Sequence, residues 1–416
     1  MSVIAEIFSQ GEEVVSGQTV DSNAAWLSQQ LVDSGFTVTR HTAVGDDLEA
    51  LVSLIKEISQ RADCCVCTGG LGPTSDDLTT QAVSLASGLA LQFDPEAMEQ
   101  IEQYFAQRQR PMPEANRKQA YFPQGAMRID NPVGTAPGFA VKINRCWFSF
   151  LPGVPSEMKA MFPAVKQQWI PSFQVEPERR ITLRSIGIGE STIQQRVQDI
   201  PLPSGVRLGF RAAIEEVQTK LYFSAEVPTN QQRTFIDQIH SAIGEAVFAI
   251  DGISPETDGD LLTTVDRLLQ QTDQSLGARS SHPQLALLES VSGGLLAAKC
   301  QGKPWLDSAY IASDISQAGR HFNLDLPTHS PLQAVEQLAE HLLMLGADLA
   351  LVQLHHAHQD SSLLLYNGLL TQEGMYHSQI TLAGPPARRQ IQAAMLTLDL
   401  LRRTLQHRTL SAAPHP

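Results

Sequence analysis

A glycine-rich segment that runs into two carboxylates is the strongest chemical signal in this sequence. Residues 67–79 read CTGGLGPTSDDLT, between an apolar run and a predicted helix. Backbone N–H groups of Gly69, Gly70 and Gly72 can close on phosphate oxygens, helped by the positive end of the helix. One of the two following aspartates, Asp76 and Asp77, can cap the helix, and the other can bind a divalent cation. A tight turn with a capping aspartate is the structural alternative.

Three more polar turns lie near the ends of predicted strands. Gly11-Glu12-Glu13 follows the first strand, Gly45-Asp46-Asp47 follows the second, and NPVGTAPG (131–138) precedes another strand. Because strand-end turns of a parallel sheet meet at one edge, we expect them to converge on the glycine-rich segment. Each acidic pair alone is more typical of a helix N-cap. The joint pattern favours a site in which a cation separates the carboxylates.

The elements that must hold these turns alternate between strands and helices. Residues 3–8, 36–41 and 62–68 are strand-like, while 19–34 and 46–60 have helical spacing and a further helix begins near 78. The apolar run at 62–68 (ADCCVCT) is typical of a strand buried on both faces. This order predicts an α/β domain with a parallel sheet, which continues to a strand ending at Phe150.

Composition shifts divide the rest of the chain. A charged segment lies at 176–180, and DGISPETDGD (251–260) is rich in glycine, proline and acids. Between them, residues 180–250 predict a small α+β module, and α/β patterns resume from 261 to about 405. We therefore predict three domains, at 1–172, 173–255 and 256–416.

Charge and cysteine usage exclude several classes of protein. The 416 residues carry a net charge of −14, which disfavours a general nucleic-acid binder. No apolar run approaches the roughly 20 residues that span a bilayer, and the N-terminus has no basic region typical of a signal peptide. Five cysteines without a regular framework indicate reduced thiols, so we expect a cytoplasmic protein. A metal site at Cys65 and Cys67 is the alternative to thiols packed in a strand.

Residues 1–170 resemble the N-terminal domain of the CinA (competence/damage-inducible protein) family, which is similar to the molybdopterin-binding fold of MoaB and Mog proteins. The resemblance lies in SGQTVDSNAAWL (16–27), VGDD (44–47), TGGLGPTSDDLT (68–79), RPMPEANRKQA (110–120), NPVGTAPGF (131–139) and LPGVPSEM (151–158). The family's usual Gly-Asp-Glu is Gly11-Glu12-Glu13 here. The segment SIGIGES (185–191) resembles the KH-like module of full-length CinA proteins, although no GXXG loop with basic flanks indicates RNA binding.

The resemblance implies an ADP-ribose pyrophosphatase that forms AMP and ribose 5-phosphate with a divalent metal (Mg²⁺, Mn²⁺ or Co²⁺), in a homodimer. Asp46 and Asp77 match functional aspartates of Mog-like proteins, and we predict them as catalytic residues and metal ligands, supported by Asp76 and Glu12. Lys118 is the strongest candidate for a phosphate contact, with a solvated basic patch as the alternative. The predicted substrate-binding residues are Gly69, Gly70, Gly72, Thr74, Asn116, Lys118, Asn131, Gly134 and Thr135.

Residues 258–416 resemble the CinA C-terminal domain, which in other members deamidates nicotinamide mononucleotide. LLESVSGGLLAA (287–298) matches the family's A-E-S-C-T-G-G-L-L-A, so Ser290 stands at the family nucleophile. Capping of a helix by Ser290 and Ser292 is the structural alternative. The family's Tyr and Lys of Y-S-N-x-x-K are Ser313 and Ala318 here, and only a shift of register would make Tyr310 the base. No lysine follows Lys303.

The family's T-G-I-A-G-P-G-G loop is also replaced, by His355-His356-Ala357-His358. We therefore expect deamidase activity of the C-terminal domain to be absent or very weak, and the domain to serve as a scaffold or dimerisation element. A metal site at His356 and His358 is a lesser alternative. Two other functions stay open: a bifunctional enzyme in which Ser290 works with an unidentified base, and a molybdopterin- or nucleotide-binding protein without turnover.

Overall fold

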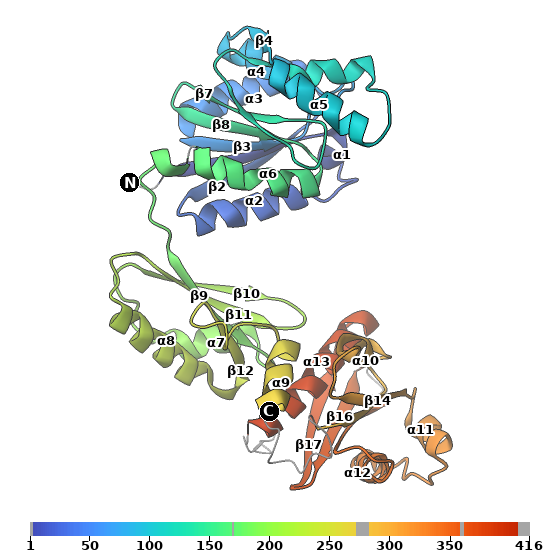
Figure 1. Cartoon of the computed structure of the whole chain (residues 1–416). Helices are drawn as coiled ribbons and strands as arrows, with labels where there is room; N and C mark the ends of the chain where they lie inside the picture. Colours follow the sequence, from blue (N-terminus) through green and yellow to red (C-terminus); the bar gives the residue numbers. More distant parts are fainter. Residues whose placement is uncertain (1–2, 169, 272–282, 358–361, 407–416) are drawn as a thin grey trace. The chain divides into compact units, whose positions relative to one another are not determined.

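The computed structural model describes residues 3–168, 170–271, 283–357 and 362–406, and the chain forms two compact units, Met1–Glu178 and Arg179–Pro416 (Figure 1). No helix among the described residues is both long enough and apolar enough to cross a membrane.

The first unit is built on a six-stranded mixed sheet in which parallel strands dominate. Its order is β2 (Thr37–Val44), β1 (Ile4–Gln10), β3 (Cys64–Thr68), β8 (Cys146–Leu151), β7 (Gly138–Ile143) and β6 (Met127–Ile129). The first four of these are parallel neighbours, and β7 is antiparallel to both of its neighbours. The predicted α/β fold is confirmed. The strand order reverses between β1 and β3, the position where open α/β sheets bind ligands.

Helices cover both faces of this sheet (Figure 1). One face carries α2 (Ser22–Asp33) and α6 (Pro155–Gln168), and the other carries α3 (Leu48–Arg61), α4 (Thr79–Ser87) and α5 (Pro95–Gln107). In α3, Leu51, Ile55 and Ile58 recur at helical spacing and are fully buried. The Asp47 carboxylate accepts the Ala50 N–H at 2.8 Å and caps this helix. A short helix α1 (Glu12–Val15), a 3-10 helix at Glu114–Ala120 and a ribbon of β4 (Leu91–Phe93) with β5 (Tyr121–Pro123) complete the unit.

The apolar run CCVCT is fully buried as β3, which confirms the predicted central strand. Its Cys65 Sγ lies 3.7 Å from Cys67 Sγ, and all five cysteines of the chain are free and buried. Burial raises the pKa of the Cys67 thiol well above its ordinary value, so this thiol stays protonated. The cysteines therefore pack as small apolar side chains.

The first unit ends at Glu178, six residues beyond the predicted boundary at 172. The Phe173 ring packs edge-on against Phe36, with the ring centroids 5.5 Å apart. Gly35 lies directly against the backbone of Glu176, where a Cβ would come within 2.9 Å of the carbonyl carbon. Residues 173–178 are thus tied to the α2–β2 turn of the first unit.

The second unit begins with a four-stranded antiparallel sheet of order β10 (Val206–Ala212), β11 (Val217–Phe223), β9 (Arg179–Ser185) and β12 (Val247–Asp251). Helices α7 (Glu190–Val197) and α8 (Thr229–Ile243) share one core with this sheet. Strand β11 alternates buried and half-buried residues, as expected for a strand that packs one face on α7 and α8. This arrangement is the α+β fold expected for residues 180–250.

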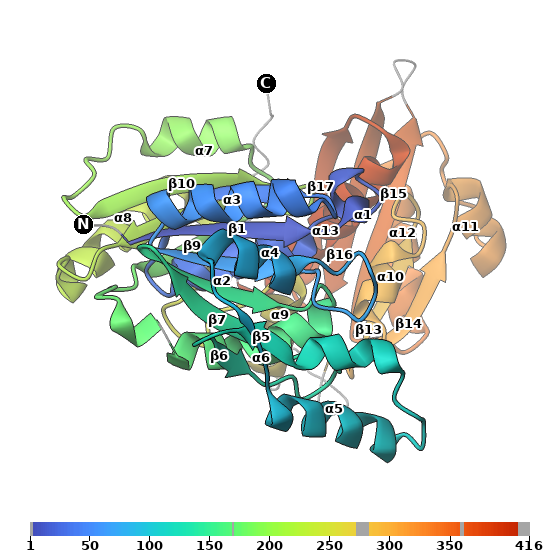
Figure 2. The ribbon, with the colours of Figure 1, turned by 90° about the horizontal axis from the view of Figure 1, so that it is seen from above.

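A second sheet of the same unit has the order β14 (Leu306–Ile311), β13 (Leu285–Glu289), β15 (Leu349–Ala357), β16 (Leu363–Thr371) and β17 (Gly374–Leu382). The strands β14, β13 and β15 are parallel, and the last two are antiparallel. One face packs on α9 (Leu261–Gln271), α10 (Leu295–Cys300) and α13 (Pro386–Leu405), and the other on α11 (Ile315–Phe322) and α12 (Pro331–Met344) (Figure 2).

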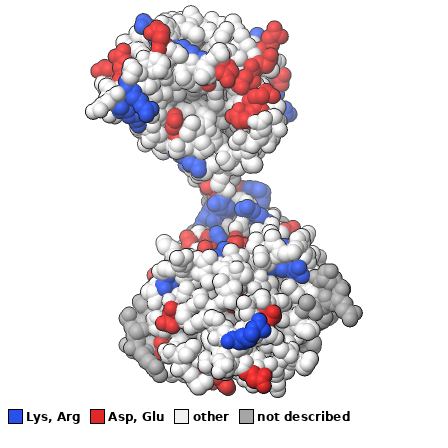
Figure 3. Space-filling view, turned by 90° about the vertical axis from the view of Figure 1, so that its right-hand side faces the viewer, with Lys and Arg blue, Asp and Glu red and all other residues white. Residues whose placement is uncertain are grey.

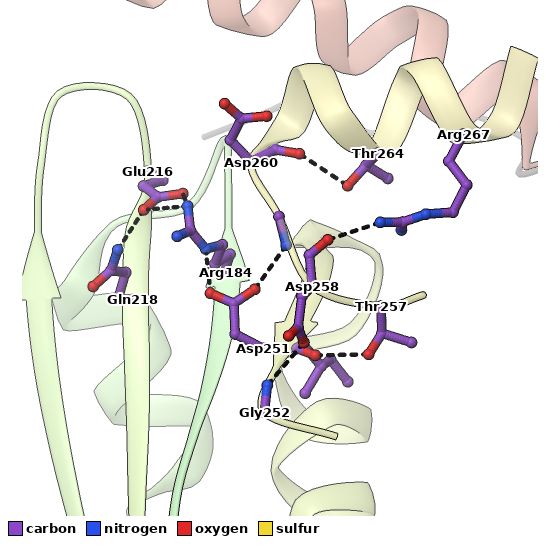
Figure 4. Close-up of polar contacts among 12 residues, drawn as sticks. Arg184, Glu216, Gln218, Asp251, Gly252, Thr257, Asp258, Asp260, Thr264 and Arg267 are labelled. Carbon is purple, nitrogen blue, oxygen red and sulfur yellow. Dashed lines mark hydrogen bonds and ion pairs between the residues drawn. The ribbon is translucent and has the colours of Figure 1, made fainter. Parts of the chain in front are cut away.

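Polar contacts connect the two sheets of the second unit through the acidic segment 251–260 (Figure 4). Arg184 on β9 contacts Asp251 at 2.7 Å and Glu216 at 3.0 Å. Asp251 in turn accepts the Gly259 N–H, and the Asp258 carbonyl accepts from Arg267 of α9. The acidic residues of this segment are thus hydrogen-bonded within the protein and fix the path of the chain from β12 to α9.

Candidate functional site

The glycine-rich loop begins where β3 ends, beside β1, and its first two glycines have backbone conformations that disfavour other residues. Gly69 has φ 98° and Gly70 has φ 66°. A Cβ at Gly69 would lie 2.2 Å from the Gln10 carbonyl oxygen, and one at Gly70 would lie 2.1 Å from Gln10 Oε1. Both positions favour glycine because of their positive φ, and Gly69 also because of its close approach to the backbone of β1.

Gln10, the last residue of β1, connects the predicted acidic turns to the glycine loop. Its Nε2 donates to Asp46 Oδ1 at 2.8 Å and to the Asp76 carbonyl at 3.4 Å, and its Oε1 accepts from the Thr79 hydroxyl. The Glu12 N–H donates to Asp46 Oδ2 at 3.2 Å. Two of the three predicted polar turns, at 11–13 and 45–47, therefore meet the glycine-rich loop in the structure. Gln10 is only 5% exposed, and sequence reasoning missed it because an amide at a strand end is a weak signal.

Asp77 and Lys118 set the shape of the loop. Asp77 Oδ1 accepts the Gly72 N–H at 2.8 Å, and Oδ2 accepts the Thr74 N–H at 2.8 Å together with the Thr74 hydroxyl. Lys118 Nζ donates to the Thr74 carbonyl and, at 3.3 Å, to the Asp77 carbonyl. Asp76 is exposed, and a hydrogen bond from Thr74, with a smaller contribution from the Lys118 charge, lowers its pKa.

A pocket of about 380 Å³ opens beside this loop. Its lining joins backbone of the glycine loop, two cations and an apolar wall: Gly70, Leu71, Gly72, Ser75, Asp77, Leu78, Thr80, Gln81, Leu91, Arg117, Lys118, Gln119 and Tyr121. Gln119 fixes the loop because its Nε2 donates to the Leu71 carbonyl at 3.0 Å. The predicted ligand Asn116 is buried behind the lining and donates to Gln119 Oε1 at 2.9 Å, so it supports the pocket indirectly.

Asn131, Gly134 and Thr135 lie at the same sheet edge but line another hollow, of about 250 Å³, against α5. They follow β6, which is three strands away from β3 in the sheet, or roughly 14 Å at ordinary strand spacing. Asn131 Oδ1 accepts the Gly134 N–H at 2.8 Å, and Nδ2 donates to Glu157 at 2.7 Å. The structure thus does not bring these three predicted residues into the glycine-loop pocket.

The four predicted metal ligands do not form a closed metal cage. Among the residues that the structure describes, no three His, Cys, Asp or Glu side chains are grouped so that they could hold a metal ion. Asp46 and Glu12 are close, since the Glu12 carboxylate lies 2.7 Å from where a Gly45 Cβ would stand. Two carboxylates suit a hard cation such as Mg²⁺ that takes its other ligands from water and substrate phosphates. The donor set fits a cation that enters with a phosphate ligand.

Two cationic side chains lie at the pocket, although the protein as a whole has a net negative charge. On the face drawn in Figure 3, acidic side chains gather in one patch of the first unit. Arg117 and Lys118 are both exposed at the pocket, with the Arg117 guanidinium 5.6 Å from the centre of the Phe93 ring. These two cations give an otherwise acidic protein a local attraction for anions.

Ser290, the predicted nucleophile, directly follows β13 in the second unit. It is 8% exposed, and its Oγ lies 3.1 Å from Nδ1 of His355 on β15. The neighbouring Ser292 has a different role, since its hydroxyl donates to the buried Glu289 and contacts Gln353 Oε1 at 2.9 Å. His355 was singled out only as part of a replaced loop, so its contact with Ser290 was not foreseen.

The residues at the family's Tyr and Lys positions, Ser313 and Ala318, offer no basic side chain to Ser290. Ser313 is exposed and donates to Asp314 at 3.2 Å, while Ala318 is buried in α11. The Tyr310 ring packs against Phe322, with the centroids 4.9 Å apart. In place of the family's glycine loop, β15 continues to Ala357 and pairs with β16. His358, part of the alternative metal site, lies outside the described residues.

Comparisons with known proteins agree with this architecture. Residues 6–172 match the family described as "Probable molybdopterin binding domain". A CinA-like protein of Shewanella loihica is 33% identical over 430 residues, covering 96% of each chain, and one of Shewanella woodyi is 40% identical over 297 residues. The second alignment spans 70% of this chain and 66%, just under two thirds, of that relative. A CinA structure from Thermoplasma acidophilum is 33% identical with a TM-score of 0.38, covering 40% of this chain and 97% of that one.

Proposed function

Because this chain belongs to the family of CinA-like proteins, we propose that its first unit hydrolyses ADP-ribose to AMP and ribose 5-phosphate with a divalent cation. The proposal rests on the chemistry of the pocket. Any activity of the second unit is a separate question.

The observation that carries the proposal is the composition of the glycine-loop pocket. Backbone of Gly70 and Gly72 lies on one side, and the cations of Arg117 and Lys118 lie on another. Such a lining suits a diphosphate, whose negative charge the two cations can balance, although the Gly72 N–H is already donated to Asp77. Leu78, Leu91 and Tyr121 complete the lining with apolar surface, which suits the base of a nucleotide. The position at the strand-order reversal between β1 and β3 agrees with both roles.

The first unit's own residues would divide the work as follows. Arg117 and Lys118 would hold the diphosphate, and Asp77 would keep the loop in shape through its bonds to Gly72 and Thr74. Asp46 and Glu12 would hold Mg²⁺, Mn²⁺ or Co²⁺. When bound, the cation would supply charge neutralisation and a more acidic water.

In the reaction itself, a water oxygen adds to one phosphorus of the diphosphate, and the bridging P–O bond on that phosphorus breaks. The products are AMP and ribose 5-phosphate, so atoms balance with one water consumed. Asp46 is half-buried, and Gln10 and the Glu12 N–H orient its carboxylate. We assign it to accept the proton of the attacking water, a role that requires its ionised form.

A second function is supported by a different observation. Fewer than three metal-binding side chains converge anywhere among the described residues, and Asp77 is fully engaged in hydrogen bonds of the loop. A pocket that lacks a catalytic cation would bind a molybdopterin or nucleotide phosphate without turnover, in line with the match to the probable molybdopterin binding domain.

One experiment separates the two functions. The full chain is incubated with ADP-ribose and Mg²⁺, Mn²⁺ or Co²⁺, and AMP is measured by chromatography. Calorimetric titration with ADP-ribose in EDTA measures binding alone. We expect AMP with at least one metal and none in EDTA. Binding without AMP under any metal would select the second function, and neither binding nor AMP would overturn both.

A further inference from the structure

We propose that His355 is the general base that activates Ser290, so that the second unit carries a serine-hydrolase centre for a carboxylic ester or amide. In this centre His355 supplies the base, because Ala318 stands at the position of the family's lysine. The proposal does not depend on the reaction proposed for the first unit, which lies in the other compact unit.

The sheet brings the two side chains together at one edge. The strands β13 and β15 are parallel neighbours, with Leu288 paired to Val352. Two residues beyond Leu288 stands Ser290, and three residues beyond Val352 stands His355, so both lie at the carboxyl end of the strands. His355 is also paired with Leu365 in the β15–β16 ladder. A base held by strands on a rigid sheet keeps the 3.1 Å contact between Nδ1 and the Ser290 Oγ.

Helix capping does not account for Ser290. The first-turn N–H groups of Leu296 and Ala297 in α10 donate to the buried Glu289 carboxylate, at 3.1 and 2.8 Å. Ser292 supplies the hydroxyl that stabilises Glu289. The Ser290 hydroxyl instead faces His355, and the Ser290 N–H donates to Gln353 Oε1. The turn therefore takes its hydrogen bonds from Glu289, Ser292 and Gln353, and the side chain of Ser290 is directed to the imidazole.

The protonation state of His355 suits a base. Burial lowers the pKa of His355, with smaller lowering effects of the His356 and Arg389 charges and an opposing effect of Asp314. The imidazole is therefore neutral at pH 7. A neutral imidazole with its proton on Nε2 presents the Nδ1 lone pair to the Ser290 hydroxyl, which is what a general base requires.

The reaction follows the two steps of acyl transfer. Ser290 Oγ attacks the carbonyl carbon while its proton moves to His355 Nδ1, and the proton then passes to the leaving alcohol or amine as the C–O or C–N bond breaks. Water next attacks the acyl-serine and loses its proton to His355, and the acid departs as the serine proton is restored. One water is consumed, and no oxidant, reductant or metal is needed.

A fluorophosphonate probe tests the pair on the full chain, because such probes form a stable bond only with activated serine oxygens. We expect labelling of wild-type protein at Ser290, located by mass spectrometry of the tryptic peptide. Replacement H355N should slow labelling roughly 100-fold or more, since it removes the base. The matched control is H356N, which changes the adjacent, exposed histidine and should label within about twofold of wild type.

Two further readouts separate a base from a structural residue. Added imidazole should restore labelling of His355→Gly, which a purely structural loss would not allow. In the wild type, the labelling rate should fall with decreasing pH around a midpoint below 6.5, because the pKa of His355 is lowered. Substitution D314N removes a negative charge that raises the pKa of His355. If the midpoint reports the titration of His355, D314N should therefore move the midpoint to a still lower pH. No adduct at Ser290, or equal rates for H355N and wild type, would overturn the proposal.

Discussion

Gly69 and Gly88 both have a positive φ, of 98° and 73°, but only Gly69 has an atom where a side chain would go. A Cβ at Gly69 would lie 2.2 Å from the Gln10 carbonyl oxygen, whereas nothing lies within 4 Å at Gly88. We predict that Gly88→Ala costs about 1–2 kcal/mol, the cost of left-handed backbone. Gly69→Ala should cost about 1–3 kcal/mol more, because overpacking is added. Calorimetric unfolding measures both, and equal shifts would contradict the close approach of β1 and the loop.

The Asp77 carboxylate gives a second residue-scale prediction. It accepts the N–H groups of Gly72 and Thr74, so Asp77→Ala should speed hydrogen exchange of these two amides roughly tenfold or more. The control is Asp76→Ala, at an exposed neighbour that does not accept these amides. Exchange is followed by mass spectrometry of the peptide that covers residues 69–78. Equal protection in both variants would show that Asp77 does not hold the loop.

At the residue scale, the sequence selected the glycines, Asp46 and Ser290 as candidates through their spacing and family resemblance. It did not identify Gln10 or His355, because each acquires its role from a partner far away in the chain. Gln10 meets Asp46 across 36 positions, and Ser290 meets His355 across 65. Such contacts follow from strand order, which no local pattern specifies.

At the scale of elements, short-range rules predicted most of the first unit. The uniform burial of β3 follows from its unbroken apolar run, and α3 follows from its spacing and its Asp47 cap. Two features of the fold could not be predicted by such short-range rules. The antiparallel β7 places the Asn131 turn three strands from the loop, and β15 extends to His355 where the family pattern has a glycine loop. Both depend on pairing between strands that are distant in sequence.

Helix α13 supplies an element-scale prediction through a buried ion pair. Arg402 is fully buried, contacts Asp399 and donates to the Glu245 carbonyl at 3.0 Å, so it ties α13 to the first sheet of the second unit. Arg402→Ala leaves Asp399 and that carbonyl without this donor and should cost about 3–5 kcal/mol. Arg403→Ala removes a partly exposed partner of the same Asp399 and should cost about 1 kcal/mol or less.

Calorimetry of both arginine variants checks this comparison. A unit of this size shifts its melting temperature by about 2–4 °C per kcal/mol, so Arg402→Ala should lower it by roughly 6–20 °C. Equal shifts for the two variants would mean that α13 does not depend on Arg402 for its attachment.

At the scale of the whole molecule, the described contacts divide the chain after Glu178. We predict that a fragment of residues 1–178 folds and retains the ADP-ribose reaction, because both core clusters around its sheet lie within it. A fragment of residues 1–172 should be less stable by about 1–2 kcal/mol, since it loses the packing of Phe173 on Phe36. Circular dichroism melts compare the two fragments. An unfolded 1–178 fragment would show that the second unit is needed for folding.

The most direct test of the central claim compares two neighbouring aspartates in the ADP-ribose reaction. Asp46→Asn keeps an acceptor for Gln10 but loses the negative charge that would hold a cation and accept a proton. Asp47→Asn also loses one negative charge, and its side chain can still cap α3. With the most effective metal at saturating ADP-ribose, we predict that the rate of AMP formation falls roughly 100-fold or more in Asp46→Asn. In Asp47→Asn it should stay within about threefold of wild type. Equal rates in both variants and the wild type would contradict a catalytic site at Asp46.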